Sequence, residues 1–127
     1  MRKFLLALAA VSTFAIGAAA PAVAEDVLGS RVVAHRSETD VIPVPGKQRY
    51  SAIRICVKRR AVRFRDLDVV YGNGGRQDLA IRRLIPAGEC TRWINLLGKR
   101  RDIRRIVLRY DTFGDRGPRA VVTAYGR

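Results

Sequence analysis

YSAIRICVK, residues 50–58, is the stretch that decides the fold of this 127-residue chain. Its apolar side chains recur at every second position, because Ile53, Ile55 and Val57 alternate with polar residues such as Arg54. Successive side chains of a β-strand point to opposite faces, whereas a helix would need apolar residues three or four positions apart. The stretch therefore predicts a strand whose isoleucine and valine face is buried.

VRFRDLDVVY, residues 62–71, continues this pattern with one break. Val62 and Phe64 are in phase, but the next apolar side chain, Leu67, follows one residue out of phase. One extra residue in a strand, a β-bulge, returns the later side chains to the first face. We therefore predict a bulge at 65–66.

A Gly-rich turn, GNGG at 72–75, separates this strand from the next alternating segment. Pairing Val69 with Leu79 keeps the apolar side chains of both strands on one face and leaves the last three turn residues as the loop. The same register places Asp66 opposite Arg82 on the outer face, where opposite charges attract. We therefore predict a β-hairpin with a cross-strand ion pair.

The rest of the chain carries the same alternation between turn residues. Further strands are predicted at 30–36, 40–44, 77–83, 91–96, 105–110 and 119–125. About seven to nine short strands of this kind are typical of an all-β antiparallel β-sandwich, with a small β-barrel as the alternative. No window keeps a helical period, so we expect at most one helical turn, at 99–104.

Residues 1–24 have the layout of a secretory signal peptide. A short cationic start precedes an apolar run from Phe4, and small residues follow up to the Ala-x-Ala sequence that ends at Ala24. The apolar run is too short for a comfortable membrane span, which needs about 20 residues. We therefore expect cleavage after Ala24, export, and a single β-sandwich domain over 25–127 without a transmembrane segment. An uncleaved anchor is the alternative.

Cys56 and Cys90 are the only two cysteines of the chain. An oxidising compartment outside the cytoplasm favours their pairing, which would close a loop of about 35 residues. The Cys-x-x-Cys spacing of redox-active pairs is missing, so we predict a structural disulfide. Two separate buried thiols are the alternative.

Three segments carry a resemblance to a known family: DLDVVYGNG at 66–74, IPAGECTRWINL at 85–96 and RRDIRRIVLRY at 100–110. With the strands around them, they make 28–126 resemble a family of small exported bacterial, mainly proteobacterial, β-rich proteins classed as a domain of unknown function. The resemblance implies a compact β-domain located in the periplasm, with secretion from the cell as the alternative. It carries over no catalytic or binding residue.

The formal net charge of +14 comes from 25 Lys and Arg against 11 Asp and Glu. Two runs, 58–60 and 99–105, concentrate the cations, and arginine binds phosphate and carboxylate groups bidentately. The candidate polyanion-binding residues are Arg59, Arg60, Arg100, Arg101, Arg104 and Arg105. The ligands expected outside the cytoplasm are lipid phosphates and head groups, other anionic envelope polymers or an acidic protein. Arginines scattered over a solvated surface without a ligand are the alternative.

Two aromatic residues suggest a different ligand. Ile94 and Leu96 alternate inward, which turns Trp93 outward, and Tyr50 lies on the polar face of its strand. Exposed aromatic rings can stack on sugars, so Trp93 and Tyr50 form a candidate glycan platform. The alternative is that both rings cover the sheet.

The chain lacks the groups that enzymes and cofactor sites use. His35 is the only histidine, and no serine lies in a nucleophile elbow. Asp66, Asp68 and Asp78 could hold calcium, but pairing with nearby arginines explains them more simply. No nucleic-acid-binding motif is present. We expect a non-enzymatic cationic domain without metal, cofactor or specific nucleic acid, or else a purely structural envelope protein.

Overall fold

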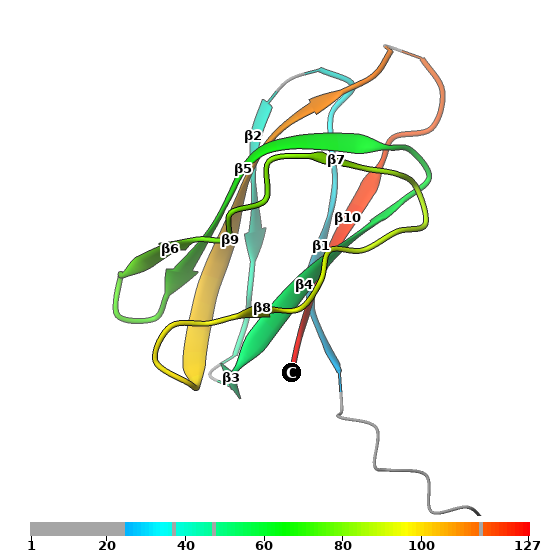
Figure 1. Ribbon diagram of the computed structural model, residues 1–127. Helices are drawn as coiled ribbons and strands as arrows, with labels where there is room; N and C mark the ends of the chain where they lie inside the picture. Colours follow the sequence, from blue (N-terminus) through cyan, green and yellow to red (C-terminus); the bar gives the residue numbers. More distant parts are fainter. Residues whose placement is uncertain (1–24, 37, 47, 115) are drawn as a thin grey trace, which may run out of the picture.

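The computed structural model describes residues 25–36, 38–46, 48–114 and 116–127 (Figure 1). The predicted signal peptide, residues 1–24, lies outside the described residues. The described chain forms two antiparallel sheets that pack face to face (Figure 1). The predicted all-β sandwich is therefore confirmed, and the sheets do not close into a barrel in the part of the chain described.

The two sheets divide the strands unequally. The smaller sheet has the order β1 (Asp26–Val32), β10 (Val121–Gly126), β4 (Ala52–Lys58) and β8 (Ile94–Asn95). The larger sheet has the order β2 (Glu38–Pro43), β9 (Arg101–Thr112), β5 (Val62–Tyr71) and β6 (Arg76–Asp78), while β3 (Arg49–Tyr50) pairs with β9 and β7 (Leu84–Ile85) with β5. The described residues form ten strands rather than seven to nine, because three strands have only two residues.

Side chains from both sheets meet in one apolar core. Ile53, Ile55 and Val57 of β4 have no solvent exposure, which confirms the predicted face of that strand. Leu67 of β5 and Leu108 of β9 are equally buried in the opposite sheet. Burial of one such side chain contributes about 1.5–3 kcal/mol, so the alternating pattern holds the two layers together.

The bulge predicted in β5 is present. Phe64 lies opposite Tyr110 and Asp66 lies opposite Arg109, so Arg65 is the extra residue. The bulge brings Leu67 onto the same buried face as Phe64. The interruption of the apolar alternation between Phe64 and Leu67 is therefore explained by the predicted bulge.

The predicted hairpin forms, but its register was wrong by two residues. Val69 lies opposite Gln77 instead of Leu79. The Tyr71 N–H donates to the Gly75 carbonyl at 2.8 Å, which closes a loop of three residues, 72–74, one position earlier than the predicted loop. A shift of two residues leaves every side chain on its original face, which is why the apolar pattern alone did not exclude either register.

The chain after β6 compensates for this shift. The Leu79 N–H donates to the Leu67 carbonyl at 2.8 Å, and Ala80 then takes a left-handed backbone conformation with φ +55°. Arg82 thereby returns to Asp66, with 3.6 Å between the Arg82 guanidinium and the Asp66 carboxylate. The predicted ion pair is present, although the predicted pairing of the strands is not.

No helical turn forms at 99–104, because β9 already begins at Arg101. Tyr50 and Arg49 of β3 pair with Arg101 and Asp102, which extends β9 beyond the predicted start at Arg105. The described residues contain no helix with the length and apolar character needed to cross a membrane.

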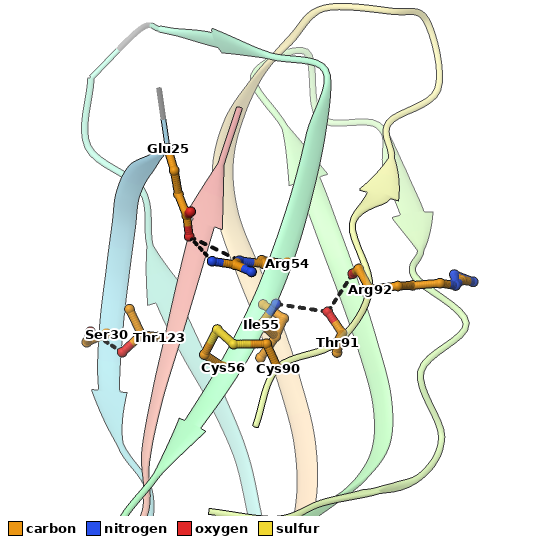
Figure 2. The surroundings of a disulfide bond; sticks show 9 residues. All are labelled: Glu25, Ser30, Arg54, Ile55, Cys56, Cys90, Thr91, Arg92 and Thr123. Atoms are coloured by element: carbon orange, nitrogen blue, oxygen red, sulfur yellow. Dashed lines mark hydrogen bonds and ion pairs between the residues drawn. A yellow bond between two sulfur atoms is a disulfide. The ribbon is translucent and has the colours of Figure 1, made fainter. Parts of the chain in front are cut away.

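The Cys56–Cys90 disulfide is present and joins β4 to the segment before β8 (Figure 2). Thr91 strengthens this junction: its N–H donates to the Ile55 carbonyl at 2.8 Å, and its hydroxyl accepts from the Ile55 N–H at 3.0 Å. Because β8 has only two residues, the segment before it is held against β4 by the disulfide, by Thr91 and by backbone hydrogen bonds of Val57 with residues 88 and 89.

Replacing both cysteines, Cys56→Ser with Cys90→Ser, should lower the free energy of unfolding by about 4 kcal/mol, the entropy model's value for a loop of about this length. Urea unfolding followed by circular dichroism measures the loss. Wild-type protein in a reducing agent should unfold at the same urea concentration as the variant. An unchanged midpoint in both would show that the disulfide does not stabilise the fold.

Candidate functional site

Five basic side chains gather where β8 leads into β9. We call this group the cationic end: Arg49, Lys99, Arg100, Arg101 and Arg104. The β8–β9 loop supplies two of these residues, and β3 adds Arg49 because it pairs with the first residues of β9. Figure 1 shows the β8–β9 loop and β3 at the same end of the sandwich.

Backbone carbonyl groups fix three arginines of the cationic end. The Arg100 guanidinium donates to the carbonyl of Arg49 at 3.2 Å. Arg101 donates to the carbonyl of Leu97 at 3.0 Å, and Arg104 to that of Gly72 at 2.8 Å. A carbonyl group is a neutral acceptor, so these bonds restrict the side chains without cancelling their charge.

Arg101 also covers a buried aromatic ring. Its guanidinium carbon lies 3.8 Å from the centre of the Tyr71 ring. Burial raises the pKa of the Tyr71 hydroxyl, although the Leu97 backbone hydrogen bond and the Arg101 charge oppose this shift. Arg101 therefore positions the loop, and its charge is not neutralised by any ion pair among the described residues.

Carboxylates pair with five arginines of the described residues, and none of the five belongs to the cationic end. The ion pairs among the described residues involve Arg31, Arg54, Arg65, Arg76 and Arg82. The acidic residue within the β9 start is Asp102, whose carboxylate lies against Gly72. Asp102 offsets part of the charge, and the cationic end keeps a net positive charge that can attract an anionic group.

The two predicted arginine runs do not meet. Arg59 and Arg60 lie in the β4–β5 turn, next to Val62, which pairs with Thr112 at the far end of β9. Arg101 lies at the other end of that strand, roughly 35 Å away at 3.3 Å per residue. The candidate polyanion-binding residues therefore do not form one patch, because Arg59 and Arg60 lie at the opposite end of the sandwich.

Arg105, the last of the predicted arginines, follows Arg104 in β9 but is less exposed than Arg104. It lies between Pro43 of β2 and Val70 of β5 in the middle of the larger sheet, and its side chain is half-buried.

Tyr50 is not an exposed aromatic residue, which corrects half of the proposed glycan platform. It is only 8% exposed, and its hydroxyl oxygen lies within hydrogen-bond distance of two acceptors, Asp26 at 3.2 Å and Gln48 at 3.0 Å. Its ring packs beside Gly126, where a side chain would collide with it. Tyr50 is buried because β3 pairs with β9 instead of continuing β4.

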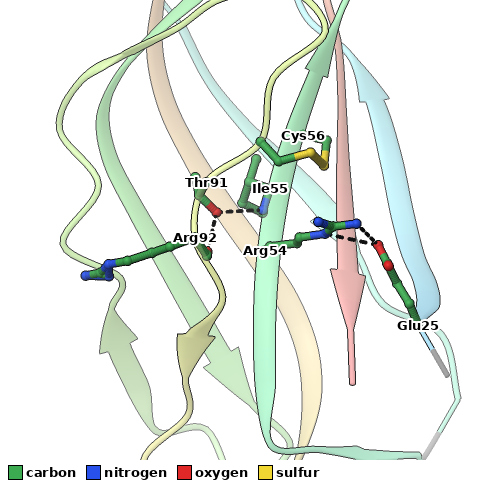
Figure 3. Close-up of polar contacts among 7 residues, drawn as sticks. Glu25, Arg54, Ile55, Cys56, Thr91 and Arg92 are labelled. Carbon is green, nitrogen blue, oxygen red and sulfur yellow. Dashed lines mark hydrogen bonds and ion pairs between the residues drawn. A yellow bond between two sulfur atoms is a disulfide. The ribbon is translucent and has the colours of Figure 1, made fainter. Parts of the chain in front are cut away.

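Trp93 is half-exposed, but two guanidinium groups stack on its ring. The Arg127 guanidinium lies 4.5 Å and the Arg54 guanidinium 5.0 Å from the ring centre. Arg54 also pairs with Glu25, with a 3.0 Å hydrogen bond from its Nε (Figure 3). The Trp93 ring is thus occupied by the protein's own cations.

The bulge in β5 borders an arginine-rich hollow of about 480 Å³. Arg65, Arg82 and Arg109 line it together with Asp66. Arg65 and Arg82 form ion pairs, at 3.2 Å to Asp111 and 3.6 Å to Asp66, respectively. Their charges are largely compensated, so this hollow is a weaker anion site than the cationic end.

The Asp66, Asp68 and Asp78 carboxylates lie within 4.8 Å of one another. Arg76 lies 3.7 Å from Asp68, and Arg82 pairs with the other two carboxylates, as the sequence led us to expect. Burial and the nearby Asp66 raise the pKa of the Asp68 carboxyl. Hydrogen bonds from the Ala80 N–H and Arg82 lower the pKa of the Asp78 carboxyl.

A family model described as a domain of unknown function, DUF2541, matches residues 5–126. The chain belongs to the DUF2541 family. No curated protein and no solved structure shows significant similarity to it. The DUF2541 match agrees with the domain of unknown function that the sequence resembles and assigns no role to a residue.

Sequence reasoning found Arg100, Arg101 and Arg104 of this DUF2541 domain, but it missed Arg49 and did not include Lys99 among the contacts. Lys99 directly precedes Arg100 and Arg101, so the density of positive charge in this segment was enough to include it among the candidate contacts. Arg49 had no local signal, because only the pairing of β3 with β9 brings it to this end.

Asp68→Asn should stabilise the fold at neutral pH, because ionised Asp68 is disfavoured in the folded state relative to the unfolded state. The gain should vanish as the pH falls below the ordinary carboxyl range, where Asp68 is protonated in both states. Asp78→Asn is the matched control. It should destabilise the fold at neutral pH, because the lowered pKa of the Asp78 carboxyl means that its ionised form is favoured in the folded state. Urea unfolding at several pH values measures the stability change of each variant. Changes of the same sign in the two variants would contradict the opposite pKa shifts of Asp68 and Asp78.

Proposed function

We propose that this DUF2541 domain is an exported, non-enzymatic module that binds anionic envelope components through its cationic end. Lipid phosphates and anionic polymers are the envelope ligands, and an acidic protein is the alternative partner. One observation carries the proposal: Arg100, Arg101 and Arg104 are held by neutral carbonyl groups. Their charge is left available for an external anion.

Fixed guanidinium groups suit this role for an energetic reason. A flexible arginine loses side-chain entropy when it binds, about 0.5–1.5 kcal/mol for each immobilised side chain. The hydrogen bonds of Arg100 and Arg104 to carbonyls restrict these side chains before a ligand arrives. Arg49 and Lys99 are exposed beside them and add charge to the same end.

Export is supported by two features of the chain. Residues 1–24 have the signal-peptide layout, and a disulfide of the Cys56–Cys90 kind persists in oxidising compartments. The periplasm of a bacterium, most simply a proteobacterium, is the location we propose, with secretion as the alternative.

The non-enzymatic part of the proposal is supported by the chemistry of the side chains. Most hydrolytic and transfer reactions need a nucleophile and a base within hydrogen-bond reach. His35 is the only histidine, and Tyr110, the most buried polar ring, donates its hydroxyl proton to Asp40 at 2.6 Å in a structural hydrogen bond. We propose no cofactor or resident metal.

A carbohydrate-binding role is a weaker candidate. A sugar ring would have to displace Arg54 or Arg127 from Trp93 before it could stack there. A purely structural envelope role would leave the uncompensated cationic end without a purpose.

Removing three exposed charges, Lys99→Gln with Arg100→Gln and Arg104→Gln, should weaken binding to vesicles of mixed phosphatidylglycerol and phosphatidylcholine. Each cation near such a surface contributes about 1 kcal/mol, so the expected loss is roughly 100-fold at low salt. Co-sedimentation with vesicles measures it, and raising the salt from about 0.05 to 0.5 M should weaken wild-type binding.

The matched control removes the same charge from the opposite end: Arg59→Gln with Arg116→Gln and Arg119→Gln. Lys99 and Arg59 both have positive φ, so each triple variant places one glutamine in a left-handed backbone conformation. The control should lose less than about threefold in affinity. Equal losses in both variants would show that net charge, and not the cationic end, determines binding.

Expression of the full chain in a bacterium with a periplasm should yield a product that begins at Glu25. Intact-mass measurement of the periplasmic fraction should show the loss of residues 1–24 and an oxidised Cys56–Cys90 pair. Ala24→Lys should block the cleavage, because the signal peptidase needs a small residue there. Unprocessed wild-type chain with both thiols reduced in the cytoplasm would overturn the export proposal.

A further inference from the structure

A shallow apolar hollow of about 530 Å³ adjoins the cationic end. Its lining includes Leu96 and Leu97, together with Gly98 and Lys99. The Leu97 side chain is 64% exposed, a large apolar group in water at the tip of a loop. An exposed apolar side chain next to cations can contact an anionic lipid bilayer in two ways, by burial of the apolar group and by attraction of the cations to lipid phosphates.

The backbone of the loop tip holds this arrangement in place. Gly98 and Lys99 both have left-handed conformations, with φ +85° and +73°, and the Arg100 N–H donates to the Gly98 carbonyl at 3.0 Å. Two successive residues of this kind reverse the chain sharply after Leu97. The tight turn therefore presents Leu97 and Lys99 at the surface of the domain.

The polar backbone groups of Leu97 are already satisfied within the protein. Its N–H donates to the Gln77 side-chain oxygen at 3.0 Å, and its carbonyl accepts from Arg101 at 3.0 Å. An unpaired backbone group would oppose transfer into lipid. Leu97 can therefore enter an apolar environment without exposing an unpaired N–H or C=O group to it.

We propose that residues 97–100 form a membrane-docking tip. Leu97 inserts among the acyl chains at the surface of an anionic bilayer, while Lys99 and Arg100 bind the phosphates of the surrounding lipids. The hollow beside Leu97 receives the apolar part of one lipid. This inference rests on the proposed function and narrows it to one ligand class, because a soluble polyanion would not use Leu97.

The test variant is Leu97→Ser, with Phe113→Ser as the matched control. Phe113 is also a large exposed apolar residue, 47% exposed, but it lies in the β9–β10 loop at the opposite end. Loss of one leucine side chain from the bilayer should weaken binding to phosphatidylglycerol-containing vesicles about tenfold. The control should bind within about twofold of wild type, since the larger Phe113 ring does not reach the bilayer.

A second ligand separates this inference from the proposed function. Leu97→Ser should bind soluble polyphosphate as the wild type does, whereas the triple charge variant should lose both polyphosphate and vesicles. If Leu97→Ser binds vesicles like the wild type while the triple variant does not, the docking tip is wrong and the cationic end stands. If wild-type protein binds neither ligand, the proposed function fails as well.

The Leu97→Trp variant, made together with Trp93→Phe, reports the position of the side chain directly. Its fluorescence should shift to shorter wavelength and be quenched by lipids with brominated acyl chains. Unquenched fluorescence at saturating vesicle concentration would place the side chain in water and overturn the inference. Circular dichroism verifies that each variant keeps the β-sheet fold.

Discussion

The antiparallel pairing of β5 with β9 is the constraint on which the rest of this domain depends. It runs from Val62 opposite Thr112 to Tyr71 opposite Ile103, almost the whole length of both strands. This pairing fixes which end of the sandwich receives each loop. It brings the first residues of β9 to the β5–β6 turn, where the Gly72 carbonyl meets Arg104. The cationic end is therefore a product of strand register as much as of local charge.

Local patterns in the sequence predicted the parts of the fold that local physics controls. The buried face of β4 and the bulge before Leu67 follow from side-chain alternation, which each strand enforces on its own residues. The hairpin register did not follow, because an even shift preserves every face. The meeting of Arg49 with Arg100 depends on pairing between segments far apart in sequence, and no pattern in either segment encodes it.

Two groups of arginines in this domain have different bonding partners. Arg54, Arg76 and Arg82 pair with carboxylates on the sheet surfaces, where exposed pairs contribute less than about 1 kcal/mol each. Three arginines of the cationic end bind neutral carbonyl oxygens instead, so their positive charge is not cancelled by these bonds. Part of the high net charge is thus paired with carboxylates on the sheet surfaces, whereas none of the ion pairs among the described residues involves the cationic end. The amino-acid composition gives only the net charge. The bonding partner of each guanidinium group shows which charges are paired with carboxylates.

Both chain ends of the described domain lie beside the cationic end. Asp26 pairs with Gly126, and the Arg127 carbonyl accepts from the Ser51 N–H at 2.7 Å (Figure 1). A purification tag attached after Arg127 would therefore emerge next to Ser51, which borders the apolar hollow. A polyhistidine tag would add titrating groups beside the cationic end, and immobilisation of the protein through this terminus would turn the cationic end toward the solid support. A tag inserted in the β9–β10 loop, at the other pole of the sandwich, would leave it open to solution.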